Sequence, residues 1–324
     1  MKIGILTSIH TQVLQHCASD LAWGFRQLGH ECEVLHENTK WTDYDGSFFH
    51  PEDTLRFIDE YMPEVLIQFD GLRTNHPRCG IPNSIPWVCW VLDRLPWLYD
   101  KRCIQPLGNK DYTLAMWPEV LTELLAIGYP KETTVEMPIG VNTEIYNTTP
   151  CAASEKYDCD IAFVTRLVSQ MPKSRIENRM NIARIAISLG VNVGLFGDGW
   201  DEYDEFKSYY RGRVNPGSDL CQCYQRAVLH IHANENTNWH MRTLEVMATG
   251  GRMAIYDCHD EPRGYPAPFA YTFERPEQLR RILESIKSVS SQEHKDISLA
   301  QYEWIDKYHS WKVRAKQILD LIKE

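Results

Sequence analysis

An arginine and a glutamate three residues apart, Arg242 and Glu245, are the side chains of this sequence best suited to chemistry. They lie in residues 238–251, a stretch that follows an apolar run and a polar loop and ends in two glycines typical of a helix C-terminus. A helix N-terminus offers unbonded N–H groups and a positive dipole end to an anion, and arginine adds donors that suit phosphate. A carboxylate on the same face can accept hydrogen bonds from sugar hydroxyls. The pattern therefore indicates a sugar-nucleotide pocket, although such a pair also occurs as a surface ion pair contributing roughly 0.2–0.5 kcal/mol.

Short apolar runs alternate with amphipathic stretches along the whole chain, which predicts strands alternating with helices. The strands are expected at residues 2–6, 31–35, 65–69, 87–92, 112–116 and 134–137, and then at 159–164, 192–196, 228–232, 252–256 and 270–273. The helices are expected at residues 13–28, 52–61, 119–127, 173–189, 218–226, 241–249 and 276–288, with a long amphipathic helix at 299–323. Continuous apolar strands of this kind predict parallel sheets covered by helices on both faces.

A stretch of small and polar residues near position 150 divides the two alternating sets and is typical of a linker. The α/β chain is therefore expected to form two doubly wound, Rossmann-like domains that face each other across a cleft. The expected boundaries are 1–147 for an acceptor-side domain, 148–156 for the linker, 157–298 for a donor-binding domain and 299–324 for a terminal helix. In such sheets ligands bind at the carboxyl ends of the strands.

The composition excludes several classes of protein. The 324 residues carry a formal net charge of −10, which argues against general nucleic-acid binding, because phosphate contacts need a basic surface. No signal-peptide pattern opens the sequence, and no apolar run reaches the ~18–20 residues that span a bilayer. The ten cysteines form no disulfide-like framework. We therefore expect a cytoplasmic protein without a transmembrane segment.

Two common nucleotide-binding motifs and a metal site are not expected. The turn after the first strand, residues 7–12, contains no glycine, so the dinucleotide fingerprint is missing there, and no Walker loop occurs. The pairs Cys221/Cys223 and His230/His232 lack the usual spacing of zinc ligands.

The second half contains most of the candidate phosphate ligands. Arg166 follows the strand at 159–164, where an α/β sheet presents ligands, and Lys173 follows shortly after it. Together they can neutralise a diphosphate leaving group. Arg175 and Arg179 belong to the same basic stretch, which is equally typical of a solvated helix face.

The sequence resembles the group 1 glycosyltransferases of the GT-B fold, most closely the CgeB-like, spore-coat-type branch. The stretches that carry the resemblance are Pro138-Ile139-Gly140-Val141-Asn142 with Tyr146, Asp160-Ile161-Ala162-Phe163-Val164 with Arg166, Gly197-Asp198-Gly199-Trp200, the segment from Arg242 to Gly251, and His309 with Arg314. The segment containing Glu245 is the strongest of them.

The resemblance implies a role for each matching residue. Glu245 would bind the ribose of the donor, Arg166 and Lys173 its diphosphate, and Val214 with Arg213 the nucleobase. Further donor contacts would come from the turn Gly197, Asp198 and Gly199 and from Asn238, His240, Met241 and Arg242. The terminal helix would cross back to the first domain. Many family members carry a glutamate eight residues before the ribose glutamate, where this chain has Thr237; Glu235, Asn236 or Asn238 could replace it.

The expected activity is that of a hexosyltransferase-type glycosyltransferase whose co-substrate is a UDP- or GDP-type sugar. Fixed cations can meet the charge of the departing phosphate, so no metal and no cofactor are expected. Asp158 and Asp160 have the spacing of a metal-binding D-x-D motif but lead into a strand. The resemblance implies a retaining outcome.

The acceptor is open: a glycan, a lipid-linked glycan, a protein, a metabolite or a nucleobase. Asp93 and His10 each follow a predicted strand of the first domain and are the candidate catalytic residues, with Asp70 as a further candidate. An ion pair of Asp93 with Arg94 or Lys101 is nearly as compatible with the sequence. Two other functions fit the same pattern, a sugar-nucleotide epimerase of GT-B-like fold and a non-catalytic sugar-nucleotide-binding module.

Overall fold

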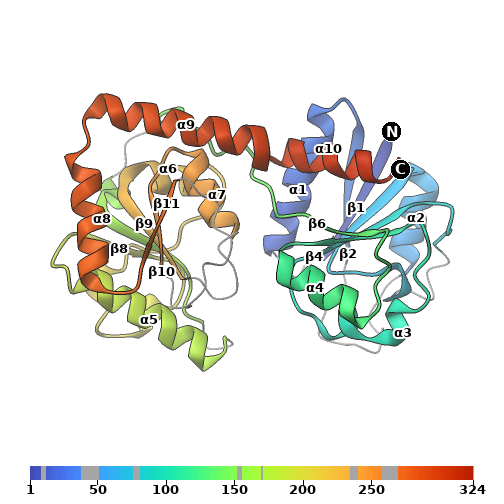
Figure 1. The fold of residues 1–324 in the computed structure, drawn as a ribbon, viewed down its shortest axis with the longest axis horizontal. Helices are drawn as coiled ribbons and strands as arrows, with labels where there is room; N and C mark the ends of the chain where they lie inside the picture. Colours follow the sequence, from blue (N-terminus) through green and yellow to red (C-terminus); the bar gives the residue numbers. More distant parts are fainter. Residues whose placement is uncertain are drawn as a thin grey trace. The chain divides into compact units, whose positions relative to one another are not determined.

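The protein is divided into two compact units. The computed structural model describes residues 1–8, 12–37, 51–75, 81–151, 155–168, 171–233, 240–256 and 269–323. Unit 1 comprises Met1–Asn142 together with Ser310–Glu324, and unit 2 comprises Thr143–His309 (Figure 1). The division therefore falls before the linker expected at 148–156, and unit 1 contains both ends of this chain.

Unit 1 is built on a parallel sheet of six strands in the order β2-β1-β3-β4-β5-β6. The strands are β1 Lys2–Ser8, β2 Glu31–Glu37, β3 Val65–Phe69, β4 Trp87–Val91, β5 Asp111–Ala115 and β6 Thr134–Glu136. The helices are α1 Gln12–Gln27, α2 Pro51–Tyr61, α3 Lys101–Ile104, α4 Pro118–Ile127 and α10 Trp311–Leu321, with short 3-10 turns at Arg73–Asn75 and Pro96–Tyr99.

Unit 2 is built on a parallel sheet of five strands in the order β11-β10-β9-β7-β8. The strands are β7 Cys159–Val164, β8 Val193–Phe196, β9 Ala227–Ala233, β10 Met253–Tyr256 and β11 Ala270–Phe273. The helices are α5 Lys173–Ile187, α6 Ser218–Arg226, α7 Met241–Ala248, α8 Pro276–Ser288 and α9 Ser291–His309, with 3-10 turns at Glu155–Tyr157, Trp200–Glu202 and Lys207–Tyr209.

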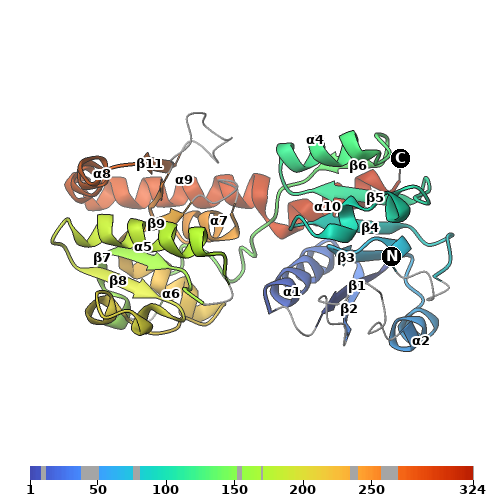
Figure 2. The same cartoon turned by 90° about the horizontal axis from the view of Figure 1, so that it is seen from below.

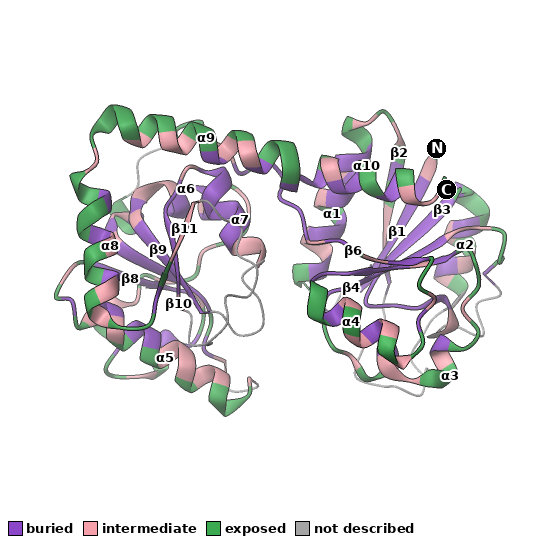
Figure 3. Cartoon of the chain, in the orientation of Figure 1, coloured by how far each residue is buried: buried purple, intermediate pink, exposed green. Residues whose placement is uncertain are grey.

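The expected fold class, two parallel-sheet α/β domains of Rossmann type, is confirmed. Central strands such as β3 and β4 are buried along their whole length, as their continuous apolar sequences require when helices cover both faces of a parallel sheet (Figures 2 and 3). In each unit the loops that follow the strands therefore share one edge of the sheet, and candidate site residues are found there.

The single terminal helix expected at residues 299–323 is wrong. Helix α9 begins earlier, at Ser291, and ends at His309, and α10 begins at Trp311. Ser310 between them has an extended backbone, and its side chain accepts a hydrogen bond from the Val313 backbone N–H, the usual role of serine at a helix N-cap. The two helices belong to different units, because α9 lies in unit 2 and α10 in unit 1.

Helix α10 completes the core of unit 1. Trp311 is fully buried, and its ring meets that of Trp90 on β4 edge to face, with centroids 5.4 Å apart. Its backbone N–H donates to the carbonyl of Val141 at 2.9 Å. A Cβ atom at Gly140 would lie 2.9 Å from the Trp311 Cα atom, so only glycine allows the chain to pass this close.

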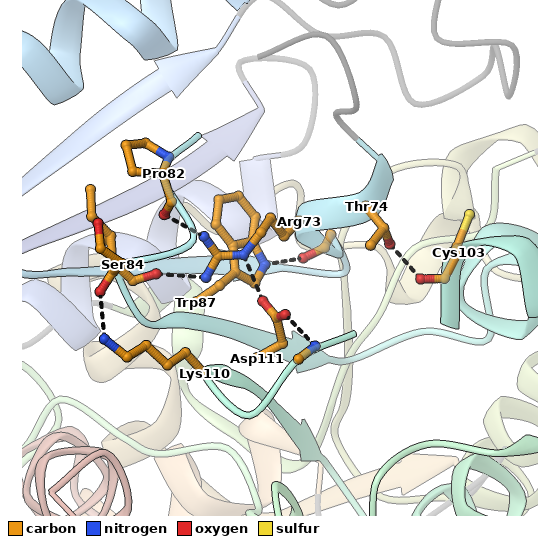
Figure 4. A network of polar contacts seen from close by, with 11 residues as sticks. Arg73, Thr74, Pro82, Ser84, Trp87, Cys103, Lys110 and Asp111 are labelled. Atoms are coloured by element: carbon orange, nitrogen blue, oxygen red, sulfur yellow. Dashed lines mark hydrogen bonds and ion pairs between the residues drawn. The ribbon is translucent and has the colours of Figure 1, made fainter. Parts of the chain in front are cut away.

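A buried arginine holds the loop after β3 (Figure 4). Arg73 donates through Nε to Asp111 Oδ1 on β5 at 2.6 Å, and through its two terminal nitrogens to the carbonyls of Pro82 and Ile85. The second oxygen of Asp111 accepts from the Gly108 N–H at 2.8 Å. Both charges are thus paired and hydrogen-bonded, which is the condition for keeping an ion pair buried. This network ties the 3-10 turn at Arg73–Asn75 to β5 and to the segment that precedes β4.

Candidate functional site

Two loops at the carboxyl edge of the unit 2 sheet are bonded directly to each other. The loop after β7 donates from the Leu167 N–H to the carbonyl of Asp198 in the loop after β8, at 2.7 Å. The indole N–H of Trp200 returns a hydrogen bond to the Thr165 carbonyl at 2.7 Å. The backbone of the two loops therefore forms one fixed platform.

The two glycines of the G-D-G turn are required by this platform. Gly197 and Gly199 have φ angles of +113° and +91°. A Cβ atom at Gly197 would fall inside contact distance of the Thr165 carbonyl, and one at Gly199 inside that of the Leu167 carbonyl. The group that approaches both glycines closely is the backbone of the neighbouring loop, which explains why glycine is needed at both positions.

The segment that carries Arg213 and Val214 runs beside the same turn. The Gly197 N–H donates to the Gly212 carbonyl at 3.1 Å, and the Lys156 ammonium donates to the Arg213 carbonyl at 3.1 Å. Val214 is partly exposed, and Asp198 on the turn is exposed. Val214 and Asp198 are thus accessible from solvent next to the platform.

The cations predicted from the sequence lie around this edge. Arg166 and Lys173 are exposed, with Lys173 the first residue of α5. The Arg179 guanidinium donates to the Arg166 carbonyl at 2.8 Å, which brings α5 up to the platform. Arg175 and Arg179 are half-buried rather than fully solvated. Both readings of these two arginines, phosphate ligands or part of a solvated helix face, remain open.

A pair of neutral histidines lies among these arginines. The rings of His232, on β9, and His240, before α7, have centroids 4.6 Å apart. Nδ1 of His240 accepts the Arg242 N–H at 3.2 Å, so this histidine caps α7. Burial, and then Arg242, Arg179 and Arg175, lower the pKa of His240 to about 3.

His232 was missed as a site residue by the sequence reasoning. Burial, and then His240 and nearby arginines, lower its pKa well below the usual histidine range. In the sequence, His232 and His230 alternate on a strand, a pattern that was considered only for metal binding. That spacing gives no sign that His240, the N-cap of α7, lies beside His232.

Glu245 is buried, with 5% of its surface exposed. One of its oxygens accepts from the hydroxyl of Tyr224 on α6 at 3.0 Å. Because the side chain is buried, the alternative of an ordinary surface ion pair with Arg242 does not apply. Met241 and Arg242, in the first turn of α7, are half-buried. An acidic group therefore lies one helical turn below a cluster of cations.

At the carboxyl edge of the unit 1 sheet, Asp93 is exposed and follows β4. Arg94 forms an ion pair with Glu123 at 2.8 Å instead of with Asp93. Asp70, after β3, is 1% exposed and adopts a left-handed φ of 54°. Its Oδ1 accepts the backbone N–H groups of Leu92 and Asp93, at 2.6 and 3.1 Å. Burial, and then the charge of Asp93, raise the pKa of Asp70 to about 8.

Several candidates lie outside the described residues, namely His10, Asn238, Thr237, Glu235 and Asn236. Within the described part of the chain, no group of three or more histidine, cysteine, aspartate and glutamate side chains could hold a metal ion. Cys221 instead has its sulfur 3.6 Å from that of Cys151. The helices of the described residues include none with the length and apolarity needed to cross a membrane.

Comparisons with known proteins place this geometry in context. Residues 177–320 match a family described as glycosyl transferase-like. No curated protein matches the chain significantly. Among solved structures, HepE of Anabaena in complex with UDP-glucose is similar, with 14% identity, a TM-score of 0.66 and coverage of 100% of this chain and 99% of that one.

Two further solved structures are similar over almost their whole length. Sucrose-phosphate synthase of Thermosynechococcus elongatus has 12% identity, a TM-score of 0.67 and coverage of 100% and 98% of the two chains. The catalytic domain of starch synthase IV of Arabidopsis thaliana, bound to ADP and acarbose, has 12% identity, a TM-score of 0.65 and coverage of 99% and 98%. The chain thus has the fold of the GT-B glycosyltransferases, and its residues 177–320 match a glycosyltransferase-like family.

Proposed function

We propose that this protein is a hexosyltransferase-type glycosyltransferase of the CgeB-like branch that takes its sugar from a UDP- or GDP-sugar bound to unit 2. One observation carries the proposal: a buried carboxylate, Glu245, lies one turn below the arginine- and histidine-lined N-terminus of α7. A ribose hydroxyl needs such an acceptor, and a diphosphate needs such cations. HepE, which has the same fold, is known in complex with UDP-glucose.

In the proposed complex, Glu245 accepts hydrogen bonds from the ribose and Val214 lies at the nucleobase. Arg166 and Lys173 bind the diphosphate, with Arg242 at the N-terminus of α7. His240 supplies a further donor, because its Nδ1 is occupied as an acceptor and its Nε2 then carries the proton. The turn Gly197-Asp198-Gly199 supplies further donor contacts in this proposal.

Catalysis in this proposal is electrostatic. Breaking the bond between the anomeric carbon and the phosphate oxygen leaves positive charge on the sugar and negative charge on the diphosphate. Fixed guanidinium groups and helix N–H groups stabilise that negative charge without rearranging. We therefore propose a transfer that needs no divalent metal, with retention at the anomeric carbon. Asp93, exposed at the edge of the unit 1 sheet, is the proposed acceptor-side catalytic group, together with His10.

Replacement of Glu245 tests the donor site. Glu245→Ala removes the proposed ribose acceptor, and we expect the affinity for the preferred sugar nucleotide to fall by about 10- to 100-fold, as for the loss of a charge-assisted hydrogen bond of roughly 1.5–3 kcal/mol. Calorimetric titration after a thermal-shift screen of UDP- and GDP-sugars measures this. Glu205→Ala is the matched control, since Glu205 is half-exposed in unit 2 and pairs with Arg184 at the surface.

Unchanged affinity of a folded Glu245→Ala protein contradicts the assignment. The products separate the remaining alternatives. Sugar transfer or hydrolysis in the presence of EDTA supports a metal-independent transferase, and the anomeric configuration of the product, read by NMR, decides between retention and inversion. Formation of an isomeric sugar would instead indicate an epimerase, and binding without turnover a non-catalytic module.

A further inference from the structure

A cavity lies at the edge of the unit 2 sheet opposite to the candidate donor site, at the amino-terminal ends of β9 and β10. Its volume is about 760 Å³. The walls come from the end of α6, the turn after α7, the middle of α9 and the segment around Pro150. Its volume is in the range of roughly 300–1,000 Å³ that is common for sites of small organic ligands. The candidate donor site described above uses none of its charged residues.

The charged residues that line this cavity are all basic. They are Arg226, Arg252 and Lys295, and no aspartate or glutamate is among the lining residues. The protein as a whole has a net charge of −10, so the lining of this cavity is more basic than the protein on average. Arg226 is paired outside the cavity with Asp158 at 2.5 Å. Arg252 and Lys295 therefore leave the lining with a surplus of positive charge.

Arg252 is a buried cation whose hydrogen-bond partners among the described residues include no carboxylate. Only 4% of its surface is exposed. Its guanidinium donates to the Gly250 carbonyl at 2.8 Å and to Gln301 Oε1 at 2.7 Å, and it also reaches Nδ1 of His294 at 3.4 Å.

The nearby histidine adds no negative charge. Nδ1 of His294 lies 3.4 Å from the Arg252 guanidinium and its Nε2 lies 3.0 Å from the Ile286 carbonyl, and an imidazole side chain supplies no counter-charge to an arginine. The carbonyl end of α7 offsets part of the charge of Arg252, at about half an elementary charge. A buried charge normally has a full counter-charge, and an anion in the cavity would provide it.

We propose that this cavity is a binding site for a small organic phosphate. The phosphate lies between Arg252 and Lys295, and the hydroxyl of Thr148 is a further donor in the lining. The organic part lies against the apolar side chains of the lining, which are Pro150, Ala227, Val228 and Leu299.

Titration with phenyl phosphate and with inorganic phosphate tests the site. Phenyl phosphate combines the anion with an apolar body, so we expect it to bind more tightly than inorganic phosphate. Lys295→Glu should weaken its binding at least tenfold, because a carboxylate then faces the anion. Lys295 is exposed on α9, so this variant is expected to fold, whereas the buried Arg252→Gln serves only as a second variant. Lys307→Glu, on the same helix and equally exposed, is the control that should keep full affinity.

The donor site also carries arginines, so its contribution is separated by Arg242→Ala. Binding of phenyl phosphate that persists in Arg242→Ala and is lost in Lys295→Glu supports the cavity. Binding that is lost in Arg242→Ala and unchanged in Lys295→Glu places the anion at α7 and overturns the proposal. Equal affinity of Lys295→Glu and the unaltered protein overturns it as well. Neither result depends on whether the protein transfers a sugar.

Discussion

The carboxyl group of Asp70 joins the loop after β3 to the loop after β4, although its burial makes ionisation unfavourable. Its Oδ1 fixes the start of the loop after β4 through two backbone N–H groups, while burial disfavours its charge. Two other acidic groups of unit 1 share this character. Burial raises the pKa of Asp20 to about 6 and that of Glu37 to about 7. In the described part of the chain, no basic group favours the charged form of any of the three.

The pH dependence of unit 1 follows from these groups. A carboxyl whose pKa is higher in the folded than in the unfolded state binds more protons when folded. Its contribution to stability is therefore fully present below the unfolded pKa of about 4 and is lost as pH rises through the folded value. We expect the free energy of unfolding of unit 1 to fall between pH 4 and about 8, by at most about 1.4 kcal/mol per pH unit for each group.

Asp70→Asn should flatten this slope. Asparagine keeps an oxygen for the two N–H groups and tolerates the left-handed backbone, but it cannot ionise. We expect the variant to be more stable than the unaltered protein at pH 8 and to lose that advantage at pH 5, measured by urea unfolding at both values. Asp59→Asn, at an exposed position on α2, is the control that should leave the slope unchanged. An unchanged slope in Asp70→Asn would show that Asp70 ionises normally.

The residues of the candidate site differ in how well the sequence predicts their role. Glu245 and Arg242 are recognisable because their spacing and the double glycine are local features, and the structure places them on one short helix, α7. The effect of Arg175 and Arg179 on His240 is not a local feature of the sequence, since more than sixty residues separate these arginines from the histidine. The environment of His232 depends on the same long-range arrangement.

At the scale of elements, the turn after β8 shows that its two glycines are required by the close approach of the loop after β7. The sequence reveals that small residues are needed there, but only the structure reveals what fills the space. Strands and helices were easier to predict: residues 65–69 and 159–164 were expected as strands and are β3 and β7. The break at Ser310 was missed because the apolar spacing continues across it, while the N-cap depends on one hydroxyl.

Substitution of Gly199 tests the platform. In Gly199→Ala the new Cβ atom would collide with the backbone of Leu167, so one of the two loops must move. We expect a loss of more than about 3 kcal/mol in the stability of unit 2, as is typical when a substitution forces backbone apart. Gly190→Ala is the matched control: its φ is +70°, but a Cβ atom there meets nothing within 4 Å. This control should lose only about 1 kcal/mol from backbone strain.

Chemical denaturation followed by circular dichroism compares the two glycine variants. Similar stabilities would mean that the loops tolerate separation, and the platform would then not be a rigid feature of the site.

At the scale of the whole molecule, the two units have separate cores, each with its own buried tryptophan. Trp311 of α10 packs on Trp90 in unit 1, whereas Trp200 of unit 2 packs edge to face on Phe206 at 5.2 Å. The composition and the alternation of strands and helices were sufficient to predict two such domains. They do not indicate that residues 310–321 complete the first core, because no local pattern in a helix specifies its distant partner; only the family resemblance implied that the terminal helix returns to the first domain.

Replacing each tryptophan separately tests the independence of the cores. We expect Trp311→Ala to lower the stability of unit 1 by about 3–5 kcal/mol through the cavity it leaves, and Trp200→Ala to do the same for unit 2. Differential scanning calorimetry should show one transition displaced in each variant and the other unchanged. If either substitution moved both transitions equally, the units would unfold as one cooperative body.

Because the chain returns to unit 1 at Ser310, the last part of unit 1 is synthesised after all of unit 2. As the polypeptide leaves the ribosome, every strand of the first sheet emerges early, but Trp311, which fills the space beside Gly140, is translated only after all of unit 2. The core of unit 1 therefore lacks Trp311 until all of unit 2 has been translated. Unit 2 has its complete sequence first and is expected to fold first. This reverses the common order in which the domain made first folds first.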